Sequence, residues 1–330
     1  MSKLLTIRDL KVSFPFFRGN TQVLLQAVKG VSFSLDRGEV LGIVGESGSG
    51  KSVSTTAIMG LLPEYAQVSG EILFDGIDIL SLSKKDLRNL RGKKIGMIFQ
   101  EPARSFDPLQ NIGNVFFETL RNTQPKISRE EAQEKTIALL QEVGLNQVHE
   151  RLKSFPHQFS GGQLQRIGIA LALAQGCELL IADEPTTALD VTIQAQIMSL
   201  LKKLQKDRKL SIIFISHNID LVASISDRIM VMYGGLVMEE NTTNSLMTAA
   251  QHPYTKALMA SSPSFEMHYT TEKLSFIPGK VIEPTSSLAG CPFYSRCSCT
   301  RENCEQILPP LTLLSTGKIR CHRIQEGETL

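Results

Sequence analysis

A glycine-rich segment near residue 50 has the composition of a phosphate-binding loop. Residues 45–52, Gly-Glu-Ser-Gly-Ser-Gly-Lys-Ser, match the Walker A pattern G-x-x-x-x-G-K-[ST]. The apolar run 39–45 before it predicts a buried strand, and 53–62 after it predicts a helix. Glycines let successive backbone N–H groups face phosphate oxygens, and the helix start adds the positive end of a dipole. We therefore expect a nucleotide site rather than an incidental turn, formed by Gly45, Glu46, Ser47, Gly48, Ser49, Gly50, Lys51, Ser52 and Val53.

Four side chains in two segments could then perform phosphoryl-transfer chemistry. Lys51 is expected to reach the β- and γ-phosphates, and the Ser52 hydroxyl is expected to ligate Mg²⁺. The apolar run 179–182 predicts a strand that ends in Asp183 and Glu184. Asp183 would hold Mg²⁺, usually through water, and Glu184 is the candidate general base for the attacking water. An apolar strand that ends in two carboxylates is commonplace, but the loop upstream favours catalysis.

A second candidate anion site lies at residues 160–163, Ser-Gly-Gly-Gln, where another helical pattern begins. A capping hydroxyl and exposed N–H groups at a helix start bind anions. The wider segment 159–166 resembles the signature motif of ATP-binding cassette (ABC) proteins. That resemblance implies that two chains meet head to tail, with each ATP between one Walker A loop and the partner's signature. In this chain the signature residues are Ser160, Gly161, Gly162 and Gln163.

Two more positions follow the order of the ABC motifs and concern catalysis. Gln100 comes after the expected strand 95–99, at the position of the Q-loop glutamine, which in the family contacts Mg²⁺ and the lytic water. His217 follows the expected strand 211–216, where the family has a switch histidine that contacts the γ-phosphate. The resemblance implies that the catalytic residues are Glu184, His217, Gln100 and Lys51, and that the Mg²⁺ ligands are Ser52, Gln100 and Asp183.

The remaining ABC positions concern nucleotide binding. Residues 188–190, Ala-Leu-Asp, fit the D-loop, which places Asp190 at the nucleotide. Phe14 stands at the A-loop position, where an aromatic ring stacks on adenine; a core phenylalanine is the alternative interpretation. The resemblance covers about residues 4–245 and implies ATP and Mg²⁺ as cofactors.

The elements that would position these residues alternate between strands and helices. The chain has 330 residues, 42% hydrophobic and 21% charged, which is typical of a soluble protein with a real core. Short β-rich runs and helical patterns up to about residue 240 predict an α/β domain with a largely parallel sheet. Strands are expected at 4–14, 27–35, 39–45, 95–99, 179–183 and 211–216, and helices at 128–143, 163–176 and 193–205. Ser128 and Glu131 are placed to form a capping box.

The predicted fold is therefore an α/β P-loop NTPase of the ABC nucleotide-binding type over residues 1–245. A helical subdomain is expected at about 101–160. Residues 246–330 are expected to form a small, irregular, Cys-rich C-terminal extension, in which 261–292 is a connection rich in Pro, Ser and Thr.

Charge and hydropathy exclude some classes of partner. With 35 Lys and Arg against 33 Asp and Glu, the net charge of +2 gives no reason to expect a nucleic-acid partner. The longest apolar stretch, 167–182, is shorter than the ~20 residues of a spanning helix, and the first residues do not resemble a signal peptide. We expect an intracellular chain that reaches a membrane through a partner.

The tail indicates a branch of the ABC family. Residues 251–258, 277–279 and 290–297 look like the C-terminal extension of ATPase subunits from dipeptide and oligopeptide importers, and 99–102 fits that branch too. This resemblance implies an ATPase at the cytoplasmic face of the inner membrane that powers peptide uptake. Its partners would be two transmembrane permease subunits, a second ABC ATPase subunit that forms a heterodimer with it, and an extracytoplasmic solute-binding protein.

Two other functions stay open. The same ATPase could serve another solute, such as a nickel chelate, glutathione or an antimicrobial peptide. A soluble ABC ATPase of DNA repair or of ribosomes is disfavoured by the near-neutral charge and by the short gap between Gln100 and Ser160, which leaves no room for a long coiled coil.

The last forty residues or so hold a cluster of cysteines. Their spacing, Cys291-x5-Cys297-x6-Cys304-x16-Cys321, lacks the C-x2-C step of common zinc sites, so by itself it indicates only a possible thiolate metal site. Cys299 lies among them, and His322 directly follows the last one. In the importer family, four cysteines at matching positions are associated with a [4Fe–4S] cluster, which implies the ligands Cys291, Cys297, Cys304 and Cys321. Zinc and free thiols are the alternatives.

Overall fold

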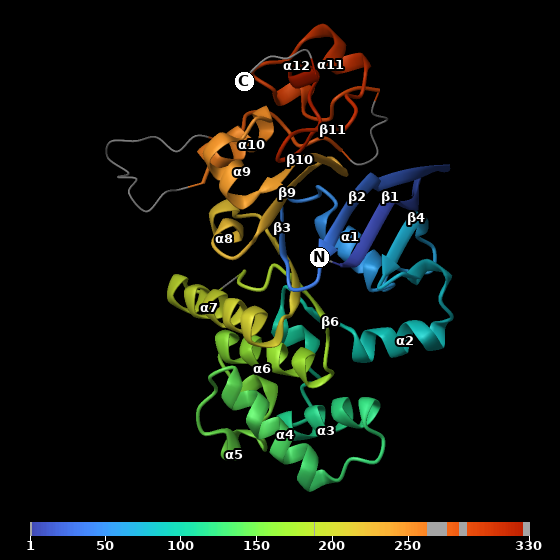
Figure 1. Cartoon of the computed structure of the whole chain (residues 1–330). Helices are drawn as coiled ribbons and strands as arrows, with labels where there is room; N and C mark the ends of the chain where they lie inside the picture. The colour runs from blue at the N-terminus through green and yellow to red at the C-terminus, as the bar shows by residue number, and fades with distance from the viewer. Residues whose placement is uncertain (1, 188, 263–275, 284–288, 326–330) are drawn as a thin grey trace. The chain divides into compact units, whose positions relative to one another are not determined.

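The computed structural model describes residues 2–187, 189–262, 276–283 and 289–325 (Figure 1). The chain forms two compact units, of which one comprises Met1–Asp36, Val40–Ser81 and Ile215–Leu330 and the other Arg37–Glu39 and Leu82–Phe214. The first unit carries the Walker A loop and the tail, and the second carries the signature segment and the two candidate carboxylates. Ala188 of the expected D-loop, and most of the expected connection 261–292, lie outside the described residues.

The first unit contains a four-stranded antiparallel sheet in the order β2-β1-β4-β5 (Figure 1, blue to cyan). Its strands are β1 (Lys3–Arg18), β2 (Thr21–Asp36), β4 (Gln67–Phe74) and β5 (Ile77–Asp78). The expected strands 4–14 and 27–35 are present as β1 and β2, but both are longer. They pair from Lys3↔Asp36 to Arg18↔Thr21, so a two-residue turn joins them.

A second set of strands in this unit has the order β11-β12-β10-β9-β3. The strands are β3 (Val40–Val44), β9 (Arg228–Tyr233), β10 (Leu236–Thr242), β11 (Thr312–Leu313) and β12 (Gly317–Ile319). β3 and β9 are parallel, but β9, β10, β12 and β11 are antiparallel in turn. The expected parallel pairing is present between β3 and β9, whereas the tight turn at Gly234 and Gly235 reverses the chain, so that the strands from β10 onward are antiparallel.

Short helices accompany these strands. They are α1 (Lys51–Ile58), α8 (Ile219–Ala223), α9 (Thr243–Ala249), α10 (Pro253–Ala260), α11 (Glu302–Gln306) and α12 (His322–Gln325), with 3₁₀ turns at Ile79–Ser81 and Tyr294–Arg296. The helix expected at 53–62 begins two residues earlier, at Lys51, and ends at Ile58. The tail is tied to the unit by strand pairing, since Glu239 of β10 lies opposite Ile319 of β12.

The second unit places helices around short parallel strands. β6 (Ile95–Ile98) pairs in parallel with β7 (Leu179–Asp183), and β8 (Ser211–Ser216), whose last two residues belong to the first unit, lies beside β7. The helices are α2 (Lys84–Lys93), α3 (Ile112–Thr123), α4 (Arg129–Glu142), α5 (Val148–Arg151), α6 (Gly161–Ala174) and α7 (Val191–Arg208), with 3₁₀ turns at Pro102–Ser105 and Pro156–Gln158. Within this unit α3, α4 and α6 pack together (Figure 1, green).

Local sequence signals placed several of these elements correctly. The strands expected at 95–99, 179–183 and 211–216 are present, and all residues of β7 and β8 are buried, as their apolar runs predict. The helices expected at 128–143, 163–176 and 193–205 are α4, α6 and α7. Ser128 and Glu131 form the predicted capping box. Among the described residues, no helix is both long and apolar enough to cross a membrane.

The strand that leads into the Walker A loop depends on a close approach at Gly42. A Cβ atom at this position would lie 2.1 Å from Cγ1 of Val222 in α8 and 2.5 Å from Oγ of Ser226. β3 is fully buried, so neither neighbour can move aside without disturbing the core. The absence of a side chain at Gly42 thus allows α8 to pack on the strand.

We predict that Gly42→Ala lowers the free energy of unfolding by about 1–3 kcal/mol, the usual cost of overpacking a core. Gly168→Ala is the matched control, because a Cβ there would meet no atom within 4 Å. Since alanine is the better helix former, this control should be neutral or stabilise α6 by up to about 1 kcal/mol. Urea denaturation of the two variants measures the difference. Equal stability of Gly42→Ala and the unchanged protein would contradict the tight packing.

Candidate nucleotide site

The Walker A loop begins where β3 ends and passes close to neighbouring backbone. A Cβ atom on Gly45 would lie 2.2 Å from the carbonyl oxygen of Met232. Gly50 has a φ of 97°, in the left-handed region, and a Cβ there would lie 2.6 Å from the carbonyl oxygen of Ala27. Both positions therefore need glycine, because the loop is wedged against the end of β9 on one side and against β2 on the other.

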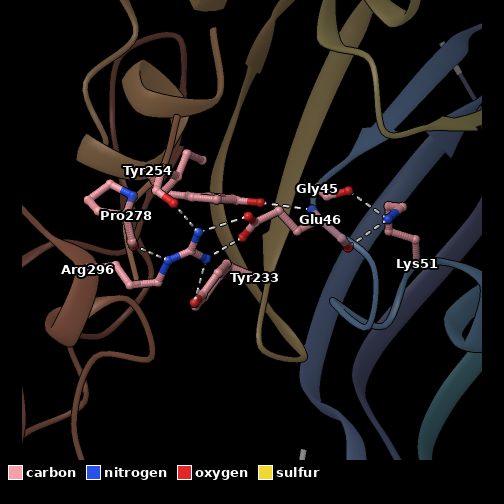
Figure 2. A network of polar contacts seen from close by, with 8 residues as sticks. Gly45, Glu46, Lys51, Tyr233, Tyr254, Pro278 and Arg296 are labelled. Atoms are coloured by element: carbon pink, nitrogen blue, oxygen red, sulfur yellow. Dashed lines mark hydrogen bonds and ion pairs between the residues drawn. The ribbon is translucent and has the colours of Figure 1, made fainter. Parts of the chain in front are cut away.

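Lys51 is folded back on its own loop. Its side chain is buried, and Nζ donates to the carbonyl oxygens of Gly45, at 2.7 Å, and Glu46, at 2.9 Å (Figure 2). The Ser52 side chain next to it is exposed at the start of α1. Ser49 is 1% exposed, and its hydroxyl has no hydrogen-bond partner among the described residues. A cation and hydroxyl oxygens are thus gathered where phosphate and Mg²⁺ are expected.

Glu46, although part of the loop, directs its carboxylate away from Lys51. The carboxylate accepts hydrogen bonds from Arg296 of the tail, while the backbone N–H of Glu46 donates to the hydroxyl of Tyr254 at 2.9 Å (Figure 2). The Arg296 side chain is only 3% exposed and the Glu46 side chain 23%. The tail and the loop are therefore joined by a largely buried ion pair within the first unit.

Two further predicted residues belong to this unit. Phe14, in β1, is half-buried, and its ring contacts that of Tyr65 edge-on at 6.4 Å between centroids. Its ring is thus only partly buried, and both adenine stacking and a packing role stay predictions. His217 follows β8 directly and is exposed, as a residue that meets a ligand must be.

In the second unit the structure brings two side chains to the carboxylate of Glu184. Nε2 of Gln100 and Oγ1 of Thr187 both donate to Oε2 of Glu184, at 3.0 and 2.9 Å. Glu184 has a φ of 46°, which turns the chain sharply after β7 and separates its side chain from that of Asp183. Asp183, at the end of the strand, is 9% exposed. The expected Q-loop glutamine and the candidate base are thus neighbours.

The signature segment forms the predicted helix start. Ser160 Oγ accepts from the N–H of Gln163, and the Gln163 side chain accepts from the N–H of Ser160, which is a capping box at the start of α6. Ser160 and Gly161 are exposed, whereas Gly162 is buried, and a Cβ on it would lie 2.7 Å from Cγ2 of Ile193. Asp190 caps α7 through a 2.9 Å bond from the N–H of Ile193.

The four predicted cysteine ligands face one small cavity in the tail, of about 20 Å³, which is lined by Cys291, Cys297, Cys304 and Cys321, and also by Cys299 and His322. Burial raises the pKa of Cys291 to about 12 and that of Cys297 to about 11, so both are protonated thiols at neutral pH. Nε2 of His322 already bonds to the carbonyl oxygen of Ile307 at 2.8 Å.

The predicted iron–sulfur centre is not assembled in this arrangement. Within the described ranges, no group of three or more His, Cys, Asp or Glu side chains is placed to hold a metal ion. The cavity has room for about one water molecule, far less than a four-iron cluster needs. The donor atoms are of the right kind, but their present spacing does not fit the group.

The chain resembles known proteins over almost its whole length. The ABC transporter family matches residues 28–187, and the C-terminal region of oligopeptide/dipeptide transporters matches residues 238–304. The oligopeptide transport ATP-binding protein OppD of Bacillus subtilis is 48% identical over 90% of this chain and 82% of its own. The dipeptide transport ATP-binding protein DppD of the same organism is 44% identical over 96% of this chain and 92% of its own.

Solved structures agree with the fold. The dimeric, post-hydrolysis ATP-binding cassette MJ0796, bound to ADP and phosphate, superposes with a TM-score of 0.63 at 29% identity, covering 72% of this chain and 98% of its own. The chain belongs to the ABC transporter family, in the branch of ATP-binding subunits of dipeptide and oligopeptide transporters. It has the mixed α/β P-loop fold of that family and is an ATPase whose hydrolysis is coupled to transport.

Sequence reasoning missed residues that contact the predicted ones. Thr187 follows Glu184 by three positions, a spacing that suits a side-chain contact in a turn and could have been noticed. Arg296 and Tyr254 lie too far along the chain from Glu46 to leave any local signal.

We predict that Thr187→Val slows ATP hydrolysis about 10- to 100-fold, because a lost hydrogen bond to a carboxylate costs about 1.5–3 kcal/mol of positioning. ATP affinity should change little, since the contact concerns only Glu184. Thr187→Ser, which keeps the hydroxyl, is the control and should retain most of the rate. A steady-state ATPase assay compares the two variants. Equal rates of hydrolysis for Thr187→Val and Thr187→Ser would show that Thr187 has no role in positioning Glu184.

Proposed function

We propose that this chain hydrolyses ATP in order to power the uptake of dipeptides and oligopeptides through a membrane permease. The Walker A loop, with its inward-turned Lys51, supports the ATPase reaction. The observation that carries the peptide cargo is the match of residues 238–304 to the C-terminal region of oligopeptide/dipeptide transporters. Relatives named for oligopeptide and dipeptide transport support the same cargo.

The proposed chemistry assigns a task to each polar group. The ammonium of Lys51 leaves the loop carbonyls and pairs with the β- and γ-phosphates, while loop N–H groups surround them. The residues that would hold Mg²⁺ are Ser52, Gln100 and Asp183, and the ion would supply positive charge against the phosphates. Glu184 accepts a proton from the attacking water, oriented by Gln100 and Thr187, and His217 contacts the γ-phosphate.

The nucleotide also needs groups outside the loop. Phe14 stacks on adenine, and its partly exposed ring next to Tyr65 supports that role. The helix start at 160–163, of which Ser160 and Gly161 are exposed, binds the γ-phosphate of the ATP held by a partner ATPase. Asp190, which caps α7, lies at the same interface between two ATPase subunits.

The proposed function also assigns two domains to the chain. Residues 1–245 form the nucleotide-binding domain, and 246–330 form the Cys-rich extension. Residues 101–160, all of which the structure describes, contain α3, α4 and α5 and no strand, which supports a helical subdomain. In this segment Leu109 is 85% exposed, and such an apolar side chain suits contact with a permease.

The partners are those of a peptide importer. Two permease subunits receive the motion of the ATPases, a sibling ATPase completes a heterodimer, and a solute-binding protein delivers peptide from outside. The chain then lies at the cytoplasmic face of the inner membrane. Competition of labelled dipeptide uptake by unlabelled peptides, a nickel chelate or glutathione tests the cargo in cells that express the complete transporter.

We predict that Glu184→Gln binds ATP normally but hydrolyses it at least ~10²-fold more slowly, the scale expected for loss of a general base. Glutamine keeps the size of the side chain and can still bond to Thr187, so folding should be preserved. Binding is measured by calorimetry and hydrolysis by phosphate release. Near-normal turnover would exclude Glu184 as the base.

A [4Fe–4S] cluster at Cys291, Cys297, Cys304 and Cys321 belongs to the same proposal. Its support is that all four face one cavity and that thiolates bind soft metals. The cavity has to open, and buried thiols have to lose protons, before the cluster can enter.

We predict about four iron and four acid-labile sulfide per chain after anaerobic purification, with visible absorption that bleaches on reduction. Cys304→Ser should abolish the signal, whereas Cys177→Ser, at a half-buried thiol of the second unit, should leave it intact. Zinc in place of iron, or the absence of both metals, would contradict the cluster while leaving the ATPase proposal unaffected.

A further inference from the structure

The guanidinium of Arg296 makes a hydrogen bond with each of its N–H groups. Nε donates to the carbonyl oxygen of Pro278 at 2.8 Å, and Nη1 and Nη2 each bond to one carboxylate oxygen of Glu46, at 2.5 and 3.0 Å. The remaining N–H groups reach the Tyr233 hydroxyl and the carbonyl oxygen of Ile277, both at 3.1 Å. All five donors of the guanidinium are thus satisfied, with the two-point fork directed at Glu46 (Figure 2).

The support around this guanidinium is rigid. The rings of Tyr233, Tyr254 and Phe293 pack together with centroids 4.8–5.4 Å apart, and all three residues are at most 1% exposed. The guanidinium carbon of Arg296 lies 5.7 Å from the Tyr233 ring centroid, which adds a cation–π contact. Bonding to Glu46 raises the pKa of Arg296 further, so its charge is permanent.

Glu46 is therefore held at three points: its carboxylate by Arg296, its N–H by Tyr254 and its carbonyl oxygen by Lys51. The first two anchors come from outside the loop and remain when Lys51 turns toward a phosphate. A free carboxylate at this place would repel the triphosphate, whereas a paired one does not.

We propose that Arg296 is a positioning residue of the ATP site, by which the C-terminal extension neutralises Glu46 and holds the phosphate loop in its binding conformation. This inference rests on the proposed ATPase function. It assigns to the extension a direct part in nucleotide affinity, through residues that do not touch the nucleotide themselves.

The first test is the affinity of the full-length protein for MgADP, measured by calorimetry. Arg296→Ala leaves a half-buried, unpaired carboxylate in the loop and should weaken binding at least about 10-fold. For ATP hydrolysis, KM should rise by a similar factor while kcat changes less than about threefold, because Glu184 and Gln100 are untouched. Unchanged affinity in Arg296→Ala would overturn the proposal.

Removal of the uncompensated charge should reverse the defect. Glu46→Gln in the Arg296→Ala background should recover most of the affinity for MgADP that Arg296→Ala loses. A purely structural role of Arg296 in the tail would not be corrected at Glu46. Lack of recovery in the double variant would therefore also overturn the proposal.

A matched control separates loop positioning from damage to the tail. Arg320 is likewise a buried arginine of the extension, and its guanidinium donates to the carbonyl oxygens of Val237 and Pro309. Arg320→Ala should lower stability yet leave the affinity for MgADP unchanged; an equal loss in both arginine variants would contradict a specific role of Arg296.

If Arg296→Ala does not fold, Arg296→Lys keeps the charge without the two-point fork and should show a smaller loss in the same direction. Full affinity in that variant would contradict the need for the fork. An unchanged protein that binds no nucleotide would refute the ATPase function itself, whereas normal binding in every variant would refute only the role of Arg296.

Discussion

The structure of the first unit depends on the close packing of the Walker A loop against the neighbouring backbone. The turn after β3 passes so close to the end of β9 that a single methyl group on Gly45 would collide with the carbonyl of Met232. The same loop is tied to the turn after β9, where the N–H of Gly235 donates to the carbonyl oxygen of Ser49 at 3.1 Å. Phosphate affinity requires N–H groups at fixed positions, and these contacts are what hold the backbone there.

Much of the fold follows from local patterns, and the reasons are physical. Apolar runs such as 179–182 can only be satisfied by burial, so β7 was predictable, and Ser160 with Gln163 carries its own capping signal. The pairing of β1 with both β2 and β4 was not predictable, because Leu5 faces Phe74 across a long stretch of chain. Register between distant strands depends on the whole core and leaves no mark in a short window.

The residues of the candidate site also fall into those that local sequence motifs predict and those that they do not. Lys51, Ser52, Asp183 and Glu184 could be proposed as site residues because phosphoryl transfer demands those residue types in fixed local patterns. The bond from Gln100 to Glu184 joins two such motifs and agrees with their order along the chain. The ion pair between Glu46 and Arg296 spans 250 positions, and neither partner belongs to a pattern that announces the other. Only the folded structure shows that the carboxylate of Glu46 is paired with the guanidinium of Arg296.

This ion pair also explains how an acidic side chain can reside in an anion-binding loop. Glu46 and Arg296 cancel each other, so that Lys51 sets the local charge that a phosphate meets. The compensating charge comes from beyond residue 245, as do Tyr254 and the strand β12 that extends β10. The composition of the chain changes near residue 245 because the segment that follows has few apolar residues of its own. That segment is stabilised by packing against β9 and β10. Arg296, which holds the Walker A loop, immediately precedes Cys297, which lines the cysteine cavity. A rearrangement that opened this cavity would therefore move the residue next to Arg296.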